Sequence, residues 1–209
     1  MSGFGDEYVE PAETIHEEEP RYYSANRVYT YSDYLQLPAE ECYYYEILDG
    51  TLIKEPAPTK LHQRVSRRLQ RILEDYFWQR DPQAEIFNSP IDLVLSETNV
   101  IQPDLVYAPE DSDDICEHGI TVIPQLIVEV ISPSTERKDR FKKLGIYSRA
   151  GVSHYWIVDP KQQTLKSFRL VKPGEYVLYR SAEGDEVFTH PDFPGLAIHL
   201  DVLWRKGRL

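Results

Sequence analysis

Apolar residues between positions 61 and 77 recur at intervals of three and four, the period of an amphipathic helix. They are Leu61, Val65, Leu69, Ile72, Leu73, Tyr76 and Phe77. A second helix is predicted over residues 134–150, because serine and threonine open this segment and Gly151 closes it. A shorter helix is predicted within residues 29–40.

Two pairs of strands are predicted in the first half of the chain, where short runs are rich in β-branched and aromatic residues. Residues 43–57 contain Asp49-Gly50, a dipeptide that tolerates the positive φ angles of a tight hairpin turn. Residues 84–96 and 100–108 are separated by a short polar segment and predict a second antiparallel pair.

The second half begins with two apolar runs of the kind that is buried on both faces of a sheet. Residues 125–132 (QLIVEVIS) and 152–160 (VSHYWIVDP) flank the second helix. A strand, a helix and a strand in close succession form a crossover, so these two strands should run parallel. Residues 164–209 alternate strand-like runs with glycine and proline turns, and predict an antiparallel extension.

These elements predict a mixed α/β fold in one domain, over residues 27–209. Residues 1–26 are acidic and lack an apolar period, so we expect a flexible arm there. The sequence has no apolar run long enough to cross a membrane, no basic-then-apolar leader, and two cysteines without metal or disulfide spacing. We therefore expect a cytoplasmic protein with no membrane partner.

The net charge of −12 argues against a nucleic-acid ligand unless the charges are unevenly distributed. Residues 1–19 hold seven acids and no bases, and 12 of the 23 bases lie within residues 60–80 and 136–149. Four arginines of the first segment are candidate contacts to the DNA backbone: Arg64, Arg67, Arg68 and Arg71. A solvated helix face is the alternative interpretation.

The carboxylate of Glu129 lies inside an apolar strand, where a charge is costly unless it is paired or binds a cation. Asp104 begins the strand within residues 100–108. If the two strands are neighbours, both carboxylates can converge on one cation, and oxygen ligands suit Mg²⁺ or Mn²⁺ better than zinc. A turn-capping role after Pro103 is the alternative for Asp104.

This motif order resembles the PD-(D/E)XK nuclease fold and, more specifically, the Uma-type restriction endonucleases. The matching motifs are Tyr45-Glu46, Asp49-Gly50, His62, Pro103-Asp104, Val128 to Thr135, Asp139, Lys143, Tyr147, Gly151-Val152, Tyr155-Trp156 and Asp159-Pro160. The resemblance implies a restriction-endonuclease-like core, with a hairpin before it and the antiparallel extension after it. It also implies a metal-dependent endonuclease that hydrolyses DNA phosphodiester bonds.

One position departs from the general superfamily pattern, in which a lysine follows the glutamate by two residues. That position is Ile131 in this sequence. The Uma-type pattern has a lysine at the place of Lys143, so the resemblance implies a migrated catalytic lysine, with Tyr147 one turn further along the helix. The alternative is a surface ion pair between Asp139 and Lys143 at i,i+4.

Two further residues are candidate catalytic groups. Glu46 could reach the metal or orient a water, or could be an exposed strand residue. His62 could contact a phosphate or a base, or could lie on the face of its helix. Tyr147 and Trp156 are predicted to belong to the core.

The first functional hypothesis is a Mg²⁺-dependent (or Mn²⁺-dependent) endonuclease whose partner is DNA. The second is a catalytically silent nuclease-like module that binds nucleic acid or a protein, which Ile131 and the overall acidity favour. A third makes the carboxylates a purely structural network. A homodimer would suit an enzyme that cuts both strands, although no segment of the sequence marks an interface.

Overall fold

The structure is a computed structural model that describes residues 21–23, 27–82, 85–108, 115–116, 119–131 and 137–207. Apart from residues 21–23, the predicted acidic arm lies outside the described residues. The predicted start of the helix at residues 134–136 lies outside them as well.

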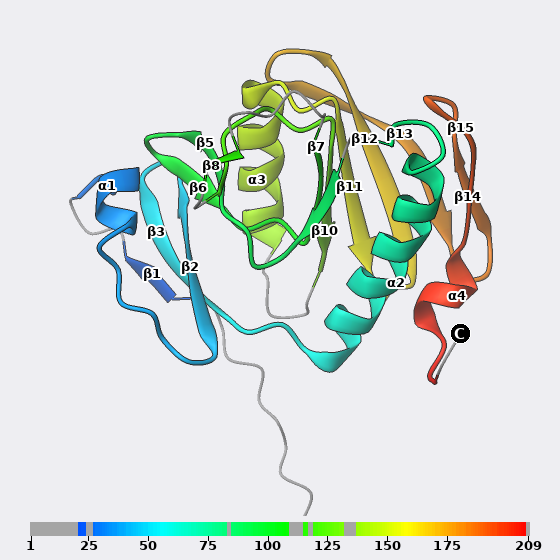
Figure 1. Cartoon of the computed structure of the whole chain (residues 1–209), viewed down its shortest axis with the longest axis horizontal. Helices are drawn as coiled ribbons and strands as arrows, with labels where there is room; N and C mark the ends of the chain where they lie inside the picture. The colour runs from blue at the N-terminus through cyan, green and yellow to red at the C-terminus, as the bar shows by residue number, and fades with distance from the viewer. Residues whose placement is uncertain are drawn as a thin grey trace, which may run out of the picture.

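Within the described ranges, the helices are α1 (Tyr31–Tyr34), α2 (Lys60–Phe77), α3 (Arg137–Ala150) and α4 (Leu200–Trp204). The central sheet has the strand order β13 (Glu175–Glu183), β12 (Thr164–Lys172), β11 (His154–Asp159), β10 (Leu126–Val130), β7 (Leu105–Ala108) and β4 (Glu85–Asn88). A second sheet has the order β1 (Arg21–Tyr23), β3 (Thr51–Pro56), β2 (Tyr43–Leu48), β6 (Asn99–Ile101), β5 (Leu93–Ser96), β9 (Gly119–Ile120) and β8 (Ile115–Cys116). A hairpin near the C-terminus consists of β14 (Val187–His190) and β15 (Phe193–His199), as Figure 1 shows.

The register of the central sheet fixes the positions of the two predicted metal ligands. β10 and β11 run parallel, with Glu129 opposite Ile157, so the predicted crossover is correct. β7 pairs with β10 in the antiparallel direction, with Val128 opposite Leu105. Asp104, one residue before Leu105, therefore comes level with Glu129 on the neighbouring strand.

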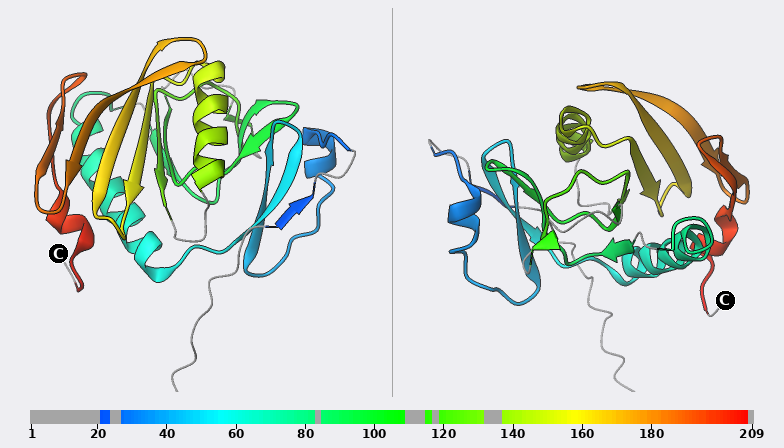
Figure 2. Two further views of the ribbon diagram at one scale, coloured as in Figure 1. Left: turned by 180° about the vertical axis from the view of Figure 1, so that it is seen from behind. Right: turned by 45° about the horizontal axis from the view of Figure 1, so that its top comes forward.

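Helices α2 and α3 cover opposite faces of the central sheet (Figure 2). On one face, the apolar residues of α2 pack against Val128 and Trp156. On the other face, Ile146 of α3 packs against Ile127 and Tyr155. The three- and four-residue period of α2 thus buries one helix face in the core, as predicted.

The hairpin of β2 and β3 turns at Asp49 and Gly50, which both have positive φ angles (47° and 75°), as the dipeptide predicts. A Cβ atom on Gly50 would lie 2.6 Å from Cγ1 of Val28, so close packing also requires glycine here. Gly151, with a φ of 94°, ends α3 in the left-handed conformation expected after a helix.

The predicted antiparallel pairing of residues 84–96 with 100–108 is correct, but each run forms two strands that lie in different sheets. β4 pairs with β7 in the central sheet, and β5 pairs with β6 in the second sheet. Pro90 and Pro103 lie between the halves of the two runs, where a residue without a backbone N–H cannot donate into a ladder. Residues 21–23, predicted as part of the arm, form β1 against β3.

Candidate active site

The carboxylate of Asp104 is held in place by two hydrogen bonds. Its Oδ2 accepts from the backbone N–H of Val130 at 2.7 Å and from Nε2 of His62 at 3.0 Å. His62 lies in the first turn of α2, which the side chain of Thr59 caps through the backbone N–H of His62. The N-cap of α2 therefore fixes the position from which His62 reaches Asp104.

Lys143 extends from α3 to two carboxylates. Its Nζ donates to Oε1 of Glu46 at 2.9 Å and to Oε1 of Glu129 at 3.2 Å. The hydroxyl of Tyr147, one turn further along α3, donates to the same oxygen of Glu129 at 2.7 Å. Only 13% of the Lys143 side chain is exposed, so this lysine is not the surface residue of the alternative interpretation.

Glu46 is fully buried in β2, so it is not an exposed strand residue. Its Oε1 accepts from the backbone N–H of Gln102 at 2.9 Å. The side-chain amide of Gln102 in turn donates to Asp92 at 2.8 Å and to the hydroxyl of Tyr34 at 3.2 Å. This network anchors the segment that leads into Asp104.

Each of the three carboxylates uses one oxygen for these contacts. The oxygens in use are Oδ2 of Asp104, Oε1 of Glu129 and Oε1 of Glu46. The second oxygen of each makes no hydrogen bond to a described residue, and Oε2 of Glu46 is also buried. Oxygens that are oriented but unpaired are the chemistry that a hard divalent cation requires.

The pKa values of the site reflect burial and crowding of negative charge. Burial raises the pKa of Glu129 to about 7, with Asp104 and Glu46 adding to the effect and Lys143 opposing it. Burial lowers the pKa of His62, but the hydrogen bond and the charge of Asp104 outweigh it, so the net shift is upward. Burial likewise opposes the charge of Lys143, yet Glu129 and Glu46 raise its pKa well above the usual value.

The arginines of α2 do not share one environment. Arg67 and Arg71 are exposed and Arg64 is half-buried. At about 100° per residue, these three lie roughly 140–200° around the helix from His62. They therefore form a basic face on the outside of α2, directed away from Asp104.

The predicted contact of Arg68 with the DNA backbone is not what the structure shows, because the protein itself uses this guanidinium. Arg68 is only 4% exposed, and its guanidinium donates to four backbone carbonyls at the C-terminal end of the described chain. The acceptors are the carbonyl oxygens of Val202 at 2.8 Å, Leu203 at 3.3 Å, Arg205 at 2.6 Å and Gly207 at 2.6 Å. Arg68 thus satisfies free carbonyls at the end of α4 and in the residues that follow it.

Sequence reasoning gave no functional role to Tyr147 or Gln102. The spacing of Tyr147 from Lys143 is i,i+4, which places both on one helix face and could have marked the contact with Glu129. Gln102 acts on Glu46 through its backbone N–H, for which the sequence carries no signal. Trp156 is fully buried in the core, as predicted.

Comparisons with known proteins show which family and which fold this chain resembles. Residues 31–202 match the Uma2 family, described as "Putative restriction endonuclease". "Uncharacterized protein slr1290" of Synechocystis sp. is 26% identical over 175 residues, which cover 83% of this chain and 90% of the relative. The crystal structure of "a putative nuclease belonging to DUF820" from Anabaena variabilis has a TM-score of 0.68 at 20% identity, covering 84% of this chain and 97% of that one.

The fold is therefore that of a nuclease-like α/β protein, and the family match over residues 31–202 shows that the chain belongs to the Uma2 family. The predicted family and the restriction-endonuclease-like fold are confirmed. At 20% identity, the similarity to the crystal structure shows the fold alone. No helix in the described part of the chain is long and apolar enough to span a membrane.

Proposed function

We propose that this protein is a Mg²⁺-dependent or Mn²⁺-dependent endonuclease that hydrolyses DNA phosphodiester bonds. The observation that carries the proposal is the meeting of Asp104, Glu129 and Lys143 from three different elements. Two carboxylates and one ammonium group at a strand end are the charges that phosphodiester hydrolysis requires.

The residues present fit a divalent cation held by Asp104 and Glu129. Both side chains are only 13% exposed, and each has an oxygen free of hydrogen bonds to described residues. Glu46 is not close enough to Asp104 and Glu129 to form a group of three metal-ligand side chains with them. Among the described residues, such a group is formed by His154, His190 and Asp192. When bound, the cation would supply charge neutralisation for the phosphate and a lowered pKa for a coordinated water.

The ammonium group of Lys143 would stabilise the negative charge that grows on the phosphoryl oxygens. Its two contacts with Glu46 and Glu129 orient it toward the carboxylates. Ile131, at the usual lysine position, is 7% exposed, and its backbone N–H donates to Val158. The flanking helix thus offers an ammonium group where the strand has an apolar residue. This placement of Lys143 supports the endonuclease over the silent-module alternative.

His62 would act as a positioning residue for Asp104. Its hydrogen bond to Oδ2 fixes one oxygen of the carboxylate and leaves Oδ1 for the cation. Arg64, Arg67 and Arg71 would contact the DNA backbone on the outer face of α2. Because this face is directed away from Asp104, these contacts would add affinity along the nucleic acid without reaching the scissile phosphate.

The test is incubation with supercoiled, linear and single-stranded DNA at low salt, with Mg²⁺, Mn²⁺ or EDTA. We expect cleavage that requires the cation and is lost in Asp104→Asn and Glu129→Gln. Binding of DNA by the wild type without cleavage would replace this proposal with the silent module. A cytoplasmic location and a homodimer in the DNA complex belong to the same proposal, and sedimentation with a cognate duplex tests the dimer.

A further inference from the structure

A second cluster of ligand-type side chains lies where the β14–β15 hairpin packs on the central sheet. His154 begins β11, His190 ends β14, and Asp192 lies in the turn between β14 and β15. One ligand atom of each residue lies within 4.8 Å of those of the other two. Two segments of the chain, β11 and the β14–β15 hairpin, thus bring two imidazoles and one carboxylate together.

This cluster is separate from the carboxylates of the proposed active site. His154 lies opposite Leu126 in the register of β10 and β11, three residues or about 10 Å along the strand from the level of Glu129. Side chains alternate along a strand, so His154 shares the face of Trp156, which packs with α2. Glu129 instead contacts residues of α3 on the opposite face.

Polar atoms of the cluster are buried without hydrogen bonds to described residues. They are Nδ1 of His154 and Nε2 of His190. The ring centroid of Phe193 lies 4.8 Å from that of His154 and 5.1 Å from that of His190, so one apolar side chain packs against both imidazoles. Buried polar atoms without partners are rare in folded proteins and call for a ligand, an ion or a water.

We propose that His154, His190 and Asp192 bind a transition-metal ion of the zinc type. Two neutral imidazoles and one carboxylate are a ligand set that Zn²⁺ accepts and that Mg²⁺ disfavours. A tetrahedral ion with ligands at 2.0–2.1 Å needs neighbouring ligand atoms about 3.3 Å apart. The 4.8 Å spread must therefore contract when the ion binds.

Two existing contacts use atoms of the proposed ligands and must break when the ion binds. Nε of Arg169 lies 3.2 Å from Oδ2 of Asp192 and must leave that oxygen when the ion binds. The backbone N–H of Asp192 donates to Nδ1 of His190 at 3.2 Å. Coordination through Nε2 of His190 moves the ring proton to Nδ1 and breaks this hydrogen bond.

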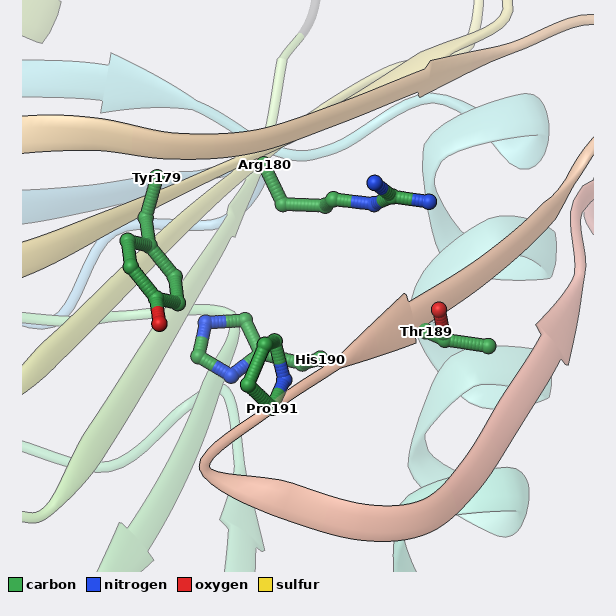
Figure 3. Close-up of a pocket in the computed structure, with 5 residues that line it drawn as sticks. All are labelled: Tyr179, Arg180, Thr189, His190 and Pro191. Atoms are coloured by element: carbon green, nitrogen blue, oxygen red, sulfur yellow. The ribbon is translucent and has the colours of Figure 1, made fainter.

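A pocket of about 300 Å³ adjoins the cluster and shares His190 with it (Figure 3). Its lining residues are Tyr179, Arg180, Thr189, His190 and Pro191. The pocket offers space for a water or a small anion as a further ligand. A bound ion would also tie the hairpin, and α4 after it, to the central sheet.

The test uses full-length, tag-free protein that has been stripped with EDTA and transferred to chelator-free buffer. Co²⁺ is titrated while the visible d–d absorption of a low-coordinate ion is recorded, and Zn²⁺ is then added as a competitor. We expect the absorption of one tightly bound, low-coordinate equivalent of Co²⁺, and we expect Zn²⁺ to abolish it. Asp192→Asn, at a partly exposed turn position, should weaken binding by at least about tenfold.

Arg169→Met removes the competing guanidinium and should tighten Co²⁺ binding. The double variant Asp104→Asn, Glu129→Gln should keep the wild-type spectrum, which distinguishes this site from the proposed active site. Absence of the Co²⁺ absorption in the wild type would overturn the proposal. So would an absorption that survives Asp192→Asn and His190→Asn, or one that the double variant abolishes.

Discussion

Glu129→Gln should make the metal-free protein more stable at pH 8, although it removes a candidate ligand. The pKa of Glu129 in the folded protein is about 7, against an ordinary value of 4.5. Between these values the folded state binds more protons than the unfolded state, so stability falls as the pH rises from about 4.5 through 7. Glutamine mimics the protonated acid and keeps an acceptor for Tyr147 and Lys143.

The size of the effect follows from the two pKa values. At about 1.4 kcal/mol per pH unit, the difference between 4.5 and about 7 corresponds to about 3 kcal/mol of unfolding free energy above pH 7. For a chain of this length, that is a rise in Tm of roughly 6–12 °C. Below about pH 4.5 the two proteins should have the same stability, because the acid is protonated in both states.

The assay is thermal unfolding in EDTA between pH 4 and 9, with Glu97→Gln as the matched control. Glu97 is exposed in the turn between β5 and β6, so its substitution should leave the curve unchanged. Addition of Mn²⁺ at pH 8 should stabilise the wild type and narrow the gap to Glu129→Gln. The reasoning fails if Glu129→Gln is no more stable than the wild type at pH 8, or if the gap does not close on acidification.

Three other outcomes are expected. Lys143→Met should lower the cleavage rate by about a hundredfold or more with little change in DNA affinity, whereas Lys142→Met, about 100° around α3, should not. Arg68→Met should cost about 2–4 kcal/mol in urea unfolding, since four carbonyls lose a charged donor, while exposed Arg67→Met should cost little. His62 should titrate above pH 6.5 by NMR, and its contribution to stability should be lost as the pH rises through that raised pKa.

Several features of the fold could be predicted because their causes are local. The apolar period of α2 needs only neighbours three and four residues apart, and the turn at Asp49-Gly50 needs only residues that accept positive φ. The parallel pair of β10 and β11 follows from the helix between them, which returns the chain to the end of the sheet where the first strand begins. The charge of Glu129 within an apolar strand marked the site, because such a charge is costly wherever the strand packs.

Other features were decided by which segments meet in space. Arg68 lies on the same helix as Arg67 and Arg71, and nothing in the sequence of that helix sets it apart. It is buried because α4 packs beside it, and its guanidinium donates to backbone carbonyls of α4 and the following residues. The contacts of Lys143 with Glu46 and Glu129 depend on where α3 packs relative to β2 and β10. The sequence of α3 does not determine that position. His154 and Asp192 carry no signal in the sequence, because only the packing of a C-terminal hairpin on β11 brings them together. The spacing of apolar residues along the sequence thus determined the helices and strands. The packing of segments that are distant in the sequence determined which charged side chains became partners.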